Sequence, residues 1–165
     1  MHTRVINFAT YSSLRIGSPL EVHLIQTPQD ALYAFSHNML LIGKANNLLI
    51  SPHAANLAML DENFSYLTEE ETYIEVGGAY SSNGIFRYFK SHNLMGVEFL
   101  QALPGSLGGL IKMNAGMKAY EIAQNLMEIN VNGTWHKTSH FPMMYRNSGI
   151  EGVILAARFH KIEGF

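Results

Sequence analysis

Short apolar runs separated by turn-forming residues mark the N-terminal part of the chain. The segment Glu21–Ile25 predicts a strand, and Thr27 followed by a proline predicts the cap of a helix that covers about Pro28–His37. Continuous apolar character predicts a buried strand at Met39–Ile42, and Leu48–Ile50 predicts another strand after a turn. The order strand, helix, strand, turn, strand is typical of a small α/β lobe.

The remainder of the chain has a different pattern. Tyr73–Val76 alternates between apolar and polar residues and ends at a pair of glycines, and Ser81–Asn83 offers a cap for a helix that extends to about His92. Pro104–Met113 predicts a loop that enters a short helix. The first of these helices has apolar positions that we assign to the core rather than to a cofactor site: Ile85, Phe86, Tyr88 and Phe89.

Further strands are predicted towards the C-terminal end, at Met127–Val131, Trp135–Lys137 and Gly152–His160. The dipeptide Asn132-Gly133 lies between the first two and is a strong signal for a two-residue hairpin turn. Strands joined by so short a turn must be antiparallel, so this region is α+β. We therefore expect an α+β chain of two lobes, a small α/β lobe over residues 1–58 and an α+β lobe over residues 59–165.

The composition excludes several classes of function. The 165 residues include no cysteine, which excludes a disulfide framework, a thiolate metal site and a cysteine nucleophile. The formal net charge of -2 gives no field that would recruit nucleic acid or an anionic membrane. Met1–Tyr11 lacks a secretory pattern and no apolar run is long enough to span a membrane, so a cytoplasmic location is expected. The histidines show no ligand spacing, and no metal is expected.

Two glycine-containing segments carry the candidate chemistry. Ile42–Leu48 lies between two predicted strands, and Leu103–Gly116 has closely spaced glycines behind Pro104, followed by Asn-Ala-Gly. Residues without a Cβ let backbone N–H groups approach a pyrophosphate. A helix opened by Pro104 would leave the N–H groups of residues 105–109 unpaired and directed at an anion. The loop at 114–116 would let a flat ring lie against the main chain.

The same glycines could serve only turns and close packing, and the local chemistry does not decide between the two interpretations. Other motifs are absent. The glycine spacing differs from G-x-G-x-x-G, Gly43-Lys44 lacks the upstream glycine of a Walker loop, and no G-x-S-x-G elbow is present. The residues by themselves therefore leave the anion site and the packing role open.

A combination of blocks resembles the UDP-N-acetylenolpyruvoylglucosamine reductases, the MurB family of bacterial flavoenzymes. The blocks keep the family's order and spacing, and they are Tyr11–Gly17, Gly96–Leu100, Leu103–Gly109, Met113–Gly116, Glu121-Ile122 and Tyr145–Ser148. The resemblance implies a two-lobed FAD-binding fold of the vanillyl-alcohol-oxidase/PCMH type. It also implies an enzyme in which NADPH reduces non-covalently bound FAD, and the flavin then passes hydride to the enolpyruvyl group of a UDP-sugar to give UDP-N-acetylmuramate for peptidoglycan.

The resemblance also assigns roles to individual residues. Those expected to bind FAD are Gly43, Lys44, Ala45, Asn46, Asn47, Leu48, Pro104, Gly105, Ser106, Gly108, Gly109, Asn114, Ala115, Gly116 and Ile122. Arg146 is the expected catalytic residue, because a fixed guanidinium would stabilise negative charge that builds beside the substrate carboxylate. Tyr145, Arg146 and Ser148 are expected to bind substrate; the alternatives are a packed aromatic for Tyr145 and a loop anchor for Ser148.

The chain departs from the family pattern in two places. Lys44 and Ala45 stand where the family usually has glycines, so Lys44 either places a cation near the phosphates or reaches solvent. Nothing matches the family's third, C-terminal substrate domain, which supplies the proton-donating serine. We therefore expect a fragment that is inactive by itself. The alternatives are another flavin oxidoreductase of the same superfamily and a non-catalytic FAD-binding module.

Overall fold

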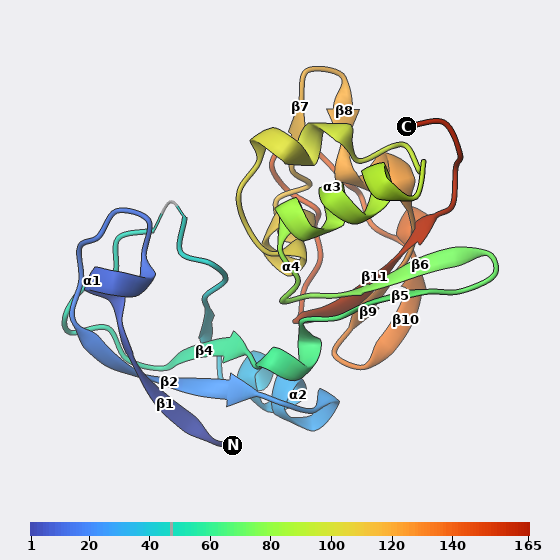
Figure 1. Cartoon of the computed structure of the whole chain (residues 1–165). Coiled ribbons are helices and arrows are strands. Elements are labelled where there is room, and N and C mark those ends of the chain that lie inside the picture. The colour runs from blue at the N-terminus through green and yellow to red at the C-terminus, as the bar shows by residue number, and fades with distance from the viewer. Residues whose placement is uncertain (47) are drawn as a thin grey trace.

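The computed structural model describes residues 1–46 and 48–165 and places them in two lobes, each built around its own sheet (Figure 1). The first sheet has the strand order β1-β2-β4-β3, in which β1 is antiparallel to β2 and the other pairs are parallel. The elements of this lobe are β1 (Thr3–Asn7), α1 (Phe8–Tyr11), β2 (Pro19–Ile25), α2 (Pro28–Ser36), β3 (Leu40–Leu41) and β4 (Leu57–Leu60). Parallel pairing of β2 with β4 requires a crossover connection, and α2 lies in it.

Local capping explains why α2 begins where the sequence predicts. The Thr27 hydroxyl accepts a hydrogen bond from the Asp30 amide at 3.1 Å, and the Asp30 carboxylate accepts one from the Thr27 amide at 3.1 Å. This reciprocal pair is a capping box, with proline at the start of the helix and His37 at its C-cap. The predicted helix and the strand before it are confirmed.

The predicted strands after α2 are partly wrong. Met39–Ile42 forms only the two-residue strand β3, which lies at the edge of the sheet with Leu40 and Leu41 54% and 41% exposed rather than buried. Leu48–Ile50 is a loop in which Leu48 and Ile50 pack on the core of the first lobe while Leu49 is exposed. The strand that completes the sheet is β4, because its Leu57 and Ala58 pair with both β2 and β3. A loop that buries apolar side chains has the same apolar pattern as a buried strand, and the sequence alone did not separate the two.

The second lobe is an antiparallel sheet in the order β10-β9-β11-β6-β5, covered on one face by α3 and α4 (Figure 1). The strands of this sheet are β5 (Leu67–Glu69), β6 (Tyr73–Gly77), β9 (Leu126–Val131), β10 (Thr134–Lys137) and β11 (Ile154–His160), and β7 (Gly116–Met117) and β8 (Tyr120–Glu121) pair with each other in a separate hairpin. The helices of this lobe are α3 (Ser82–Ser91) and α4 (Leu107–Lys112), with 3-10 turns at Glu62–Phe64, Glu98–Ala102, Ile122–Asn125 and Thr138–His140. Both residues of the predicted turn, Asn132 and Gly133, have positive φ, at 54° and 97°, as a two-residue hairpin requires. The predicted α+β lobe is confirmed.

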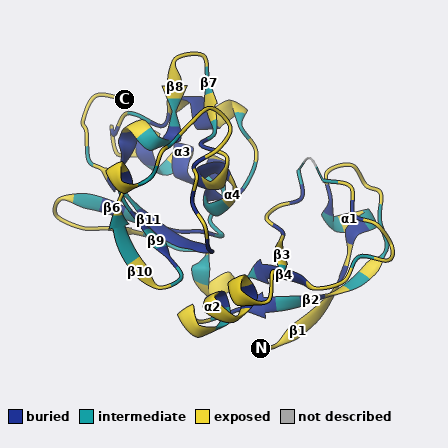
Figure 2. Cartoon of the chain, turned by 180° about the vertical axis from the view of Figure 1, so that it is seen from behind, coloured by how far each residue is buried: buried dark blue, intermediate teal, exposed yellow. Residues whose placement is uncertain are grey.

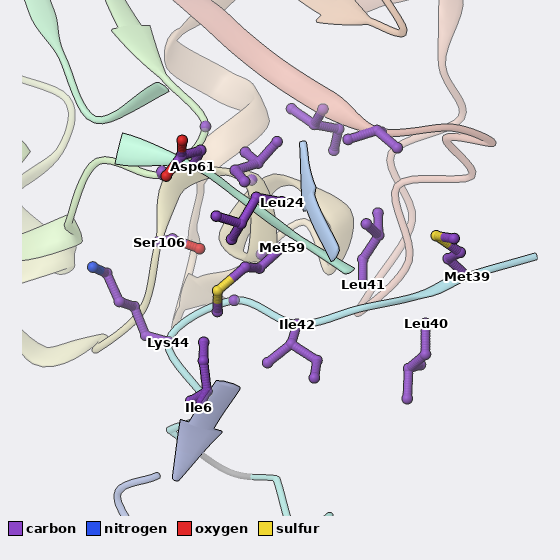
Figure 3. Close-up of a pocket in the computed structure, with 18 of the residues that line it drawn as sticks. Ile6, Leu24, Met39, Leu40, Leu41, Ile42, Lys44, Met59, Asp61 and Ser106 are labelled. Carbon is purple, nitrogen blue, oxygen red and sulfur yellow. The ribbon is translucent and has the colours of Figure 1, made fainter. Parts of the chain in front are cut away.

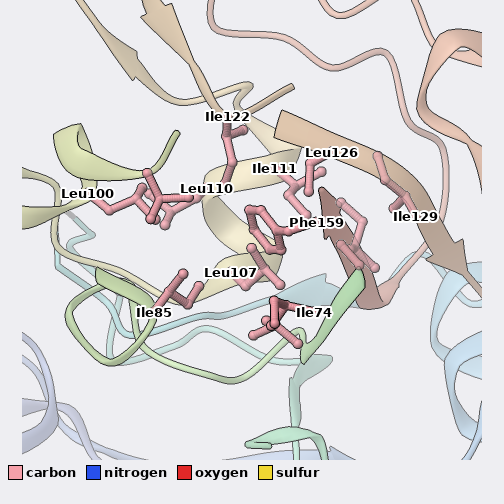
Figure 4. Packing of buried hydrophobic residues seen from close by; sticks show 14 of the residues in the cluster. Ile74, Ile85, Leu100, Leu107, Leu110, Ile111, Ile122, Leu126, Ile129 and Phe159 are labelled. Carbon is pink, nitrogen blue, oxygen red and sulfur yellow. The ribbon is translucent and has the colours of Figure 1, made fainter. Parts of the chain in front are cut away.

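The core of the second lobe lies between its sheet and the two helices (Figure 4). Ile74 and Phe159 from the sheet meet Ile85 from α3 and Leu107 from α4, and all four side chains are fully buried. The predicted helix positions follow the same pattern, since Phe86 and Phe89 are buried and Tyr88 packs at the margin. Figure 2 shows buried residues along this seam and exposed residues on the outer loops. Burial of such large apolar side chains is the main stabilising contribution here.

A separate apolar cluster joins the two lobes. Ala31 and Ala34 of α2 and Ala58 of β4 pack with Val153 and Leu155 of the second lobe. The two lobes therefore pack directly against each other through this cluster. The predicted boundary between residues 58 and 59 falls inside β4, whose last residue, Leu60, still pairs in the first sheet.

Candidate functional site

A large cleft lies between the two lobes, with a volume of about 1530 Å³ (Figure 3). One wall is apolar and is made of side chains from the first sheet and the segment after β3: Ile6, Leu24, Ile42 and Met59. The opposite wall consists largely of small residues from the second lobe: Gly78, Ala79, Ser106, Gly108 and Gly109. Such a cleft can hold a large ligand that has both apolar rings and an anionic group.

The first glycine segment is held in place by the N-terminal block Tyr11–Gly17. The Tyr11 hydroxyl donates to the Gly43 carbonyl at 2.7 Å, and burial raises the pKa of that hydroxyl, which keeps it protonated as a donor. The Ser13 amide donates to the Ala45 carbonyl at 3.1 Å, and the Ser13 hydroxyl donates to Asn46 Oδ1 at 2.9 Å. The sequence block with no obvious chemistry of its own is therefore the support for this loop.

The two glycine segments meet in the cleft. A Cβ on Gly43 would lie 3.0 Å from Ser106 Oγ, and a Cβ on Gly105 would lie 3.9 Å from Asn46 Nδ2. Segments about sixty positions apart are thus adjacent, one from each lobe. The predicted residues that line the cleft are Gly43, Lys44, Ser106, Gly108 and Gly109. Asn47 lies outside the described residues.

The second segment enters α4 differently from the prediction. Pro104 does not open the helix, because α4 begins at Leu107 with Ser106 as its N-cap. The amides of Leu107 and Gly108 are not available for a ligand, since they donate to the carbonyls of Tyr80 at 2.9 Å and Gly78 at 2.8 Å. Within residues 1–46 and 48–165, the Ser106 and Gly109 amides have no protein acceptor and both residues line the cleft. The available donors are therefore fewer than the sequence suggested.

The glycines on this wall separate into packing positions and an open position. A Cβ on Gly78 would lie 2.4 Å from the Ile154 carbonyl oxygen, and one on Gly108 would lie 3.2 Å from the Gly78 carbonyl oxygen. A Cβ on Gly109 would meet only Ser106 Oγ, at 3.6 Å. Close packing therefore accounts for Gly78 and Gly108, whereas Gly109 leaves open space beside the cleft.

Charged groups of both signs line the cleft: Arg4, Lys44, Lys112, Asp61, Glu62 and Glu151. A hydrogen bond from the Gln26 side chain at 2.6 Å, followed by one from the backbone of Glu62, holds the pKa of Asp61 below its usual range, and Arg4 lies 3.9 Å away. Lys112 donates to the Ile150 carbonyl. Lys44 lies beside the meeting point of the two glycine segments, so a local cation rather than the net charge favours an anion there (Figure 3).

The second small-residue loop does not line this cleft. Among the described lining residues none lies between Lys112 and Glu151, so Asn114, Ala115, Gly116 and Ile122 are elsewhere. The Ile122 amide donates to the Ala115 carbonyl at 2.9 Å, and Gly116 pairs with Glu121 in the β7–β8 ladder. The backbone of this loop is thus occupied by its own short hairpin.

The predicted substrate residues lie on a tight turn outside the cleft lining. Tyr145 is 79% exposed, and the Arg146 guanidinium lies 5.4 Å from the centre of its ring. Arg146 has a φ of 55°, an uncommon conformation for a side chain of this size. Ser148 is fully buried, and its hydroxyl donates to the Lys112 carbonyl at 2.9 Å. That contact fits the loop-anchor alternative for Ser148.

Other predicted FAD residues support the loops from behind the cleft. Ala45 is buried, Leu48 packs on the core of the first lobe and Pro104 is exposed ahead of α4. Sequence reasoning missed the lining residues Arg4, Gly78 and Glu151–Ile154. For the wall formed by the second lobe, the sequence contains one signal, the glycine pair that follows the predicted strand ending at Val76. In the described residues no group of three His, Asp or Glu side chains could hold a metal ion, and no helix among them could cross a membrane.

Comparisons with known proteins agree with this architecture. No family model matches the chain. UDP-N-acetylenolpyruvoylglucosamine reductase of Helicobacter hepaticus is 72% identical over 165 residues, which are 100% of this chain and 63% of that protein. The enzyme of the same name from Helicobacter pylori J99 is 46% identical over 97% of this chain and 60% of its own length. The chain thus spans less than two thirds of these relatives.

Solved structures share the fold. UDP-N-acetylenolpyruvylglucosamine reductase (MurB) from Thermus caldophilus superposes with a TM-score of 0.82 at 23% identity, covering 99% of this chain and 64% of that one. Cholesterol oxidase from B. sterolicum superposes with a TM-score of 0.59 at 14% identity, covering 96% and 37%. The fold class is therefore that of the reductase and of this group of oxidases, as the resemblance implied. Over its whole length, this chain is similar to UDP-N-acetylenolpyruvoylglucosamine reductases and shares the fold of MurB.

Proposed function

We propose that this chain is the FAD-binding portion of an NADPH-dependent reductase that converts UDP-N-acetylenolpyruvoylglucosamine to UDP-N-acetylmuramate in peptidoglycan synthesis. The observation that carries the proposal is the meeting of the segments at Gly43 and Ser106 in an interlobe cleft, in a chain 72% identical to a reductase of that name. The two-lobe division near residue 58, a cytoplasmic location and the catalytic need for the rest of the relatives' length are part of the same proposal.

The cleft has the properties that FAD requires. Gly109 leaves open space for an anion beside the main chain, and Gly43 lets the first segment lie close to Ser106. The Ser106 and Gly109 amides have no protein acceptor among the described residues, and both residues line the cleft. Lys44 supplies a cation at the same place. The apolar wall of Ile6, Leu24, Ile42 and Met59 offers a surface for flat rings.

FAD, when bound, supplies the hydride chemistry, with NADPH as the reductant. The task of this chain is to hold it through the residues above and to place a cation near the substrate. Arg146 is the proposed cation, because a guanidinium stays protonated and grips a carboxylate through two hydrogen bonds. Its guanidinium lies 5.4 Å from the centre of the Tyr145 ring, within the range of a cation–π contact.

Titration of the purified chain with FAD tests the proposal. We expect FAD to bind and its fluorescence to be quenched, with a shifted visible spectrum. Gly109→Ala should weaken binding about tenfold, because the new methyl group points into the anion site. The same change should not lower stability, since its Cβ meets only Ser106 Oγ at 3.6 Å and alanine favours a helix.

Three outcomes would contradict the proposal. A chain that is folded but neither co-purifies with FAD nor binds it on titration has another role. Binding of FAD that Gly109→Ala leaves unchanged would mean that the coenzyme lies elsewhere. A folded chain that binds FAD but, when extended to the relatives' length, does not act on the UDP-sugar would favour a different flavin oxidoreductase of this fold.

A further inference from the structure

The side chain of Asn114 connects two segments that the cleft does not join. It is 3% exposed, and its Nδ2 donates to Glu121 Oε2 at 3.0 Å and to the Met144 carbonyl at 3.2 Å. A carboxylate and a carbonyl both only accept at neutral pH, so the orientation of the amide is fixed by its partners. Asn114 is thus a buried donor shared by β8 and by the segment after β10.

The Met144 end of this contact is the start of the turn that carries Arg146. The Met144 amide donates to the Asn147 carbonyl at 2.8 Å, and the Asn147 amide donates to the Met144 carbonyl at 3.1 Å. Tyr145 and Arg146 occupy the two positions between them, with Arg146 at a φ of 55°. Because the Met144 carbonyl also accepts from Asn114, the turn is held from the second small-residue loop.

The other end of the turn has a separate anchor. The Ser148 amide and hydroxyl both donate to the Lys112 carbonyl at the end of α4, at 3.1 Å and 2.9 Å. Each side of the turn is therefore tied to one end of the segment from α4 to the small-residue loop. Two anchors that flank an exposed arginine fix its backbone even though its side chain faces solvent.

Glu121 determines the direction of the Asn114 amide. Glu121 is held in the β7–β8 ladder opposite Gly116, and its amide donates to Gln124 Oε1 at 3.2 Å. Asn114 itself has a φ of 42°, a conformation that asparagine tolerates better than most residues. Asn114 Oδ1 is buried and has no donor among the described residues, so the hydrogen bonds of this side chain are those that its Nδ2 donates.

We propose that Asn114, oriented by Glu121, is a positioning residue that fixes the Met144–Asn147 turn and thereby Arg146. The inference rests on the proposed function, because the role of Arg146 comes from there. It adds a physical link between the loop at 114–116 and the cation that acts on substrate. Movement of the small-residue loop would then be transmitted to Arg146 through a single side-chain amide.

Hydrogen exchange of the purified chain, measured by NMR in the absence of FAD, tests the link. Asn114→Asp keeps the shape of the side chain but replaces the donor by a carboxylate that repels Glu121. The protection of the Met144 and Asn147 amides should fall about tenfold, while the β9–β10 hairpin keeps its protection. Asn130→Asp is the matched control, because the Asn130 side chain acts as an acceptor for Gly133 and an aspartate retains that role.

Rescue separates a positioning amide from a merely structural side chain. Glu121→Gln keeps an oxygen acceptor for Asn114 and should leave the protection of the turn within about threefold of the wild type. In Asn114→Asp, the neighbouring carboxylate of Glu121 raises the pKa of the new aspartate, so mildly acidic solution should restore a donor and part of the protection.

Protection in Asn114→Asp that stays within about twofold of the wild type would overturn the inference. An equal loss in the β9–β10 hairpin, or no recovery in acid, would also overturn it, because both indicate general destabilisation. The measurement needs no coenzyme. If FAD does not bind but the exchange pattern is as expected, only the proposed function is contradicted. If FAD binds normally but Asn114→Asp leaves the protection of the Met144–Asn147 turn unchanged, only the role of Asn114 is contradicted.

Discussion

The two segments that meet in the cleft are held by different means. The loop at 43–46 belongs to the first lobe and is fixed from outside mainly by the side chains of Tyr11 and Ser13, with one main-chain hydrogen bond from the Ser13 amide. The segment at 105–109 belongs to the second lobe and is fixed by main-chain contacts, with its Leu107 and Gly108 amides bonded to the carbonyls of Tyr80 and Gly78. This difference predicts which of the two segments tolerates residues other than glycine. A loop held by side chains of another segment can carry Lys44 and Ala45, whereas a segment packed backbone against backbone depends on the absence of a Cβ.

The largest effect should come from the glycines of the second wall. Gly78→Ala would place a methyl group 2.4 Å from the Ile154 carbonyl oxygen and 2.8 Å from Leu60 Cδ1. We expect a loss of about 3 kcal/mol in the free energy of unfolding, because the backbone at Ile154 and Leu155 must move. Urea unfolding measures it. Gly109→Ala is the matched control and should change stability by less than about 0.5 kcal/mol; similar losses for both variants would break the comparison.

The support of the first loop should contribute less. Tyr11→Phe removes the hydrogen bond to the Gly43 carbonyl and leaves that acceptor without its donor, which should cost about 1 kcal/mol. Faster hydrogen exchange should be confined to the loop at 43–46 and its neighbours. Tyr33→Phe, at a half-exposed tyrosine of α2, provides the control and should be close to neutral. An equal effect at both tyrosines would mean that Tyr11 is an ordinary aromatic residue.

The role of Lys44 in the first loop can be tested by measuring FAD affinity rather than stability. Lys44→Gly restores the residue type that the family usually has and removes a cation from the cleft. FAD affinity at low ionic strength should fall about fivefold, and the difference should shrink as salt screens the charge. Fluorescence titration at two salt concentrations measures it. Lys90→Ala, which removes a cation from α3, should leave the affinity unchanged. A salt-independent loss would argue against a phosphate contact.

The smallest expected effect is a pH dependence at the cleft wall. The folded pKa of Asp61 lies below its ordinary value, mainly through the hydrogen bond from Gln26. The unfolded state therefore binds the proton more readily, so the stabilisation is present above the unfolded pKa of about 3.9 and is lost as pH falls through the folded pKa. Gln26→Ala should raise the pKa of Asp61, as measured by NMR titration of the carboxyl carbon. An unchanged pKa would refute the assignment of its cause.

Local signals predicted most of the fold. The capping residues of α2 and α3, the alternation in β6 and the Asn132-Gly133 turn act within a few residues, and each element formed as expected. The errors lie where tertiary packing decides. Leu48 and Ile50 are apolar because they pack on the core of the first lobe, and β4 was missed because only its parallel neighbours define it as a strand.

The candidate site was predictable only where local sequence signals define it. The glycines of both segments were visible in the sequence, and the structure places Gly43 beside Ser106. Which amides remain free was not, because the partners of Leu107 and Gly108 come from residues far away along the chain. Gly78 and the residues from Glu151 to Ile154 entered the cleft wall only through the packing of α4 on the second sheet. Contacts between residues far apart in the sequence, rather than residue type, place these residues in the cleft wall.

The central claim is that the junction of the two glycine segments holds the diphosphate of FAD, and an NMR titration of the ¹⁵N-labelled chain tests it directly. We expect FAD to shift the amide resonances of Lys44, Ser106 and Gly109 most strongly, with smaller changes at Leu107 and Gly108, whose amides are already bonded to carbonyls in the turn after β6. Binding of FAD that leaves these amides unchanged and perturbs another surface would contradict the account.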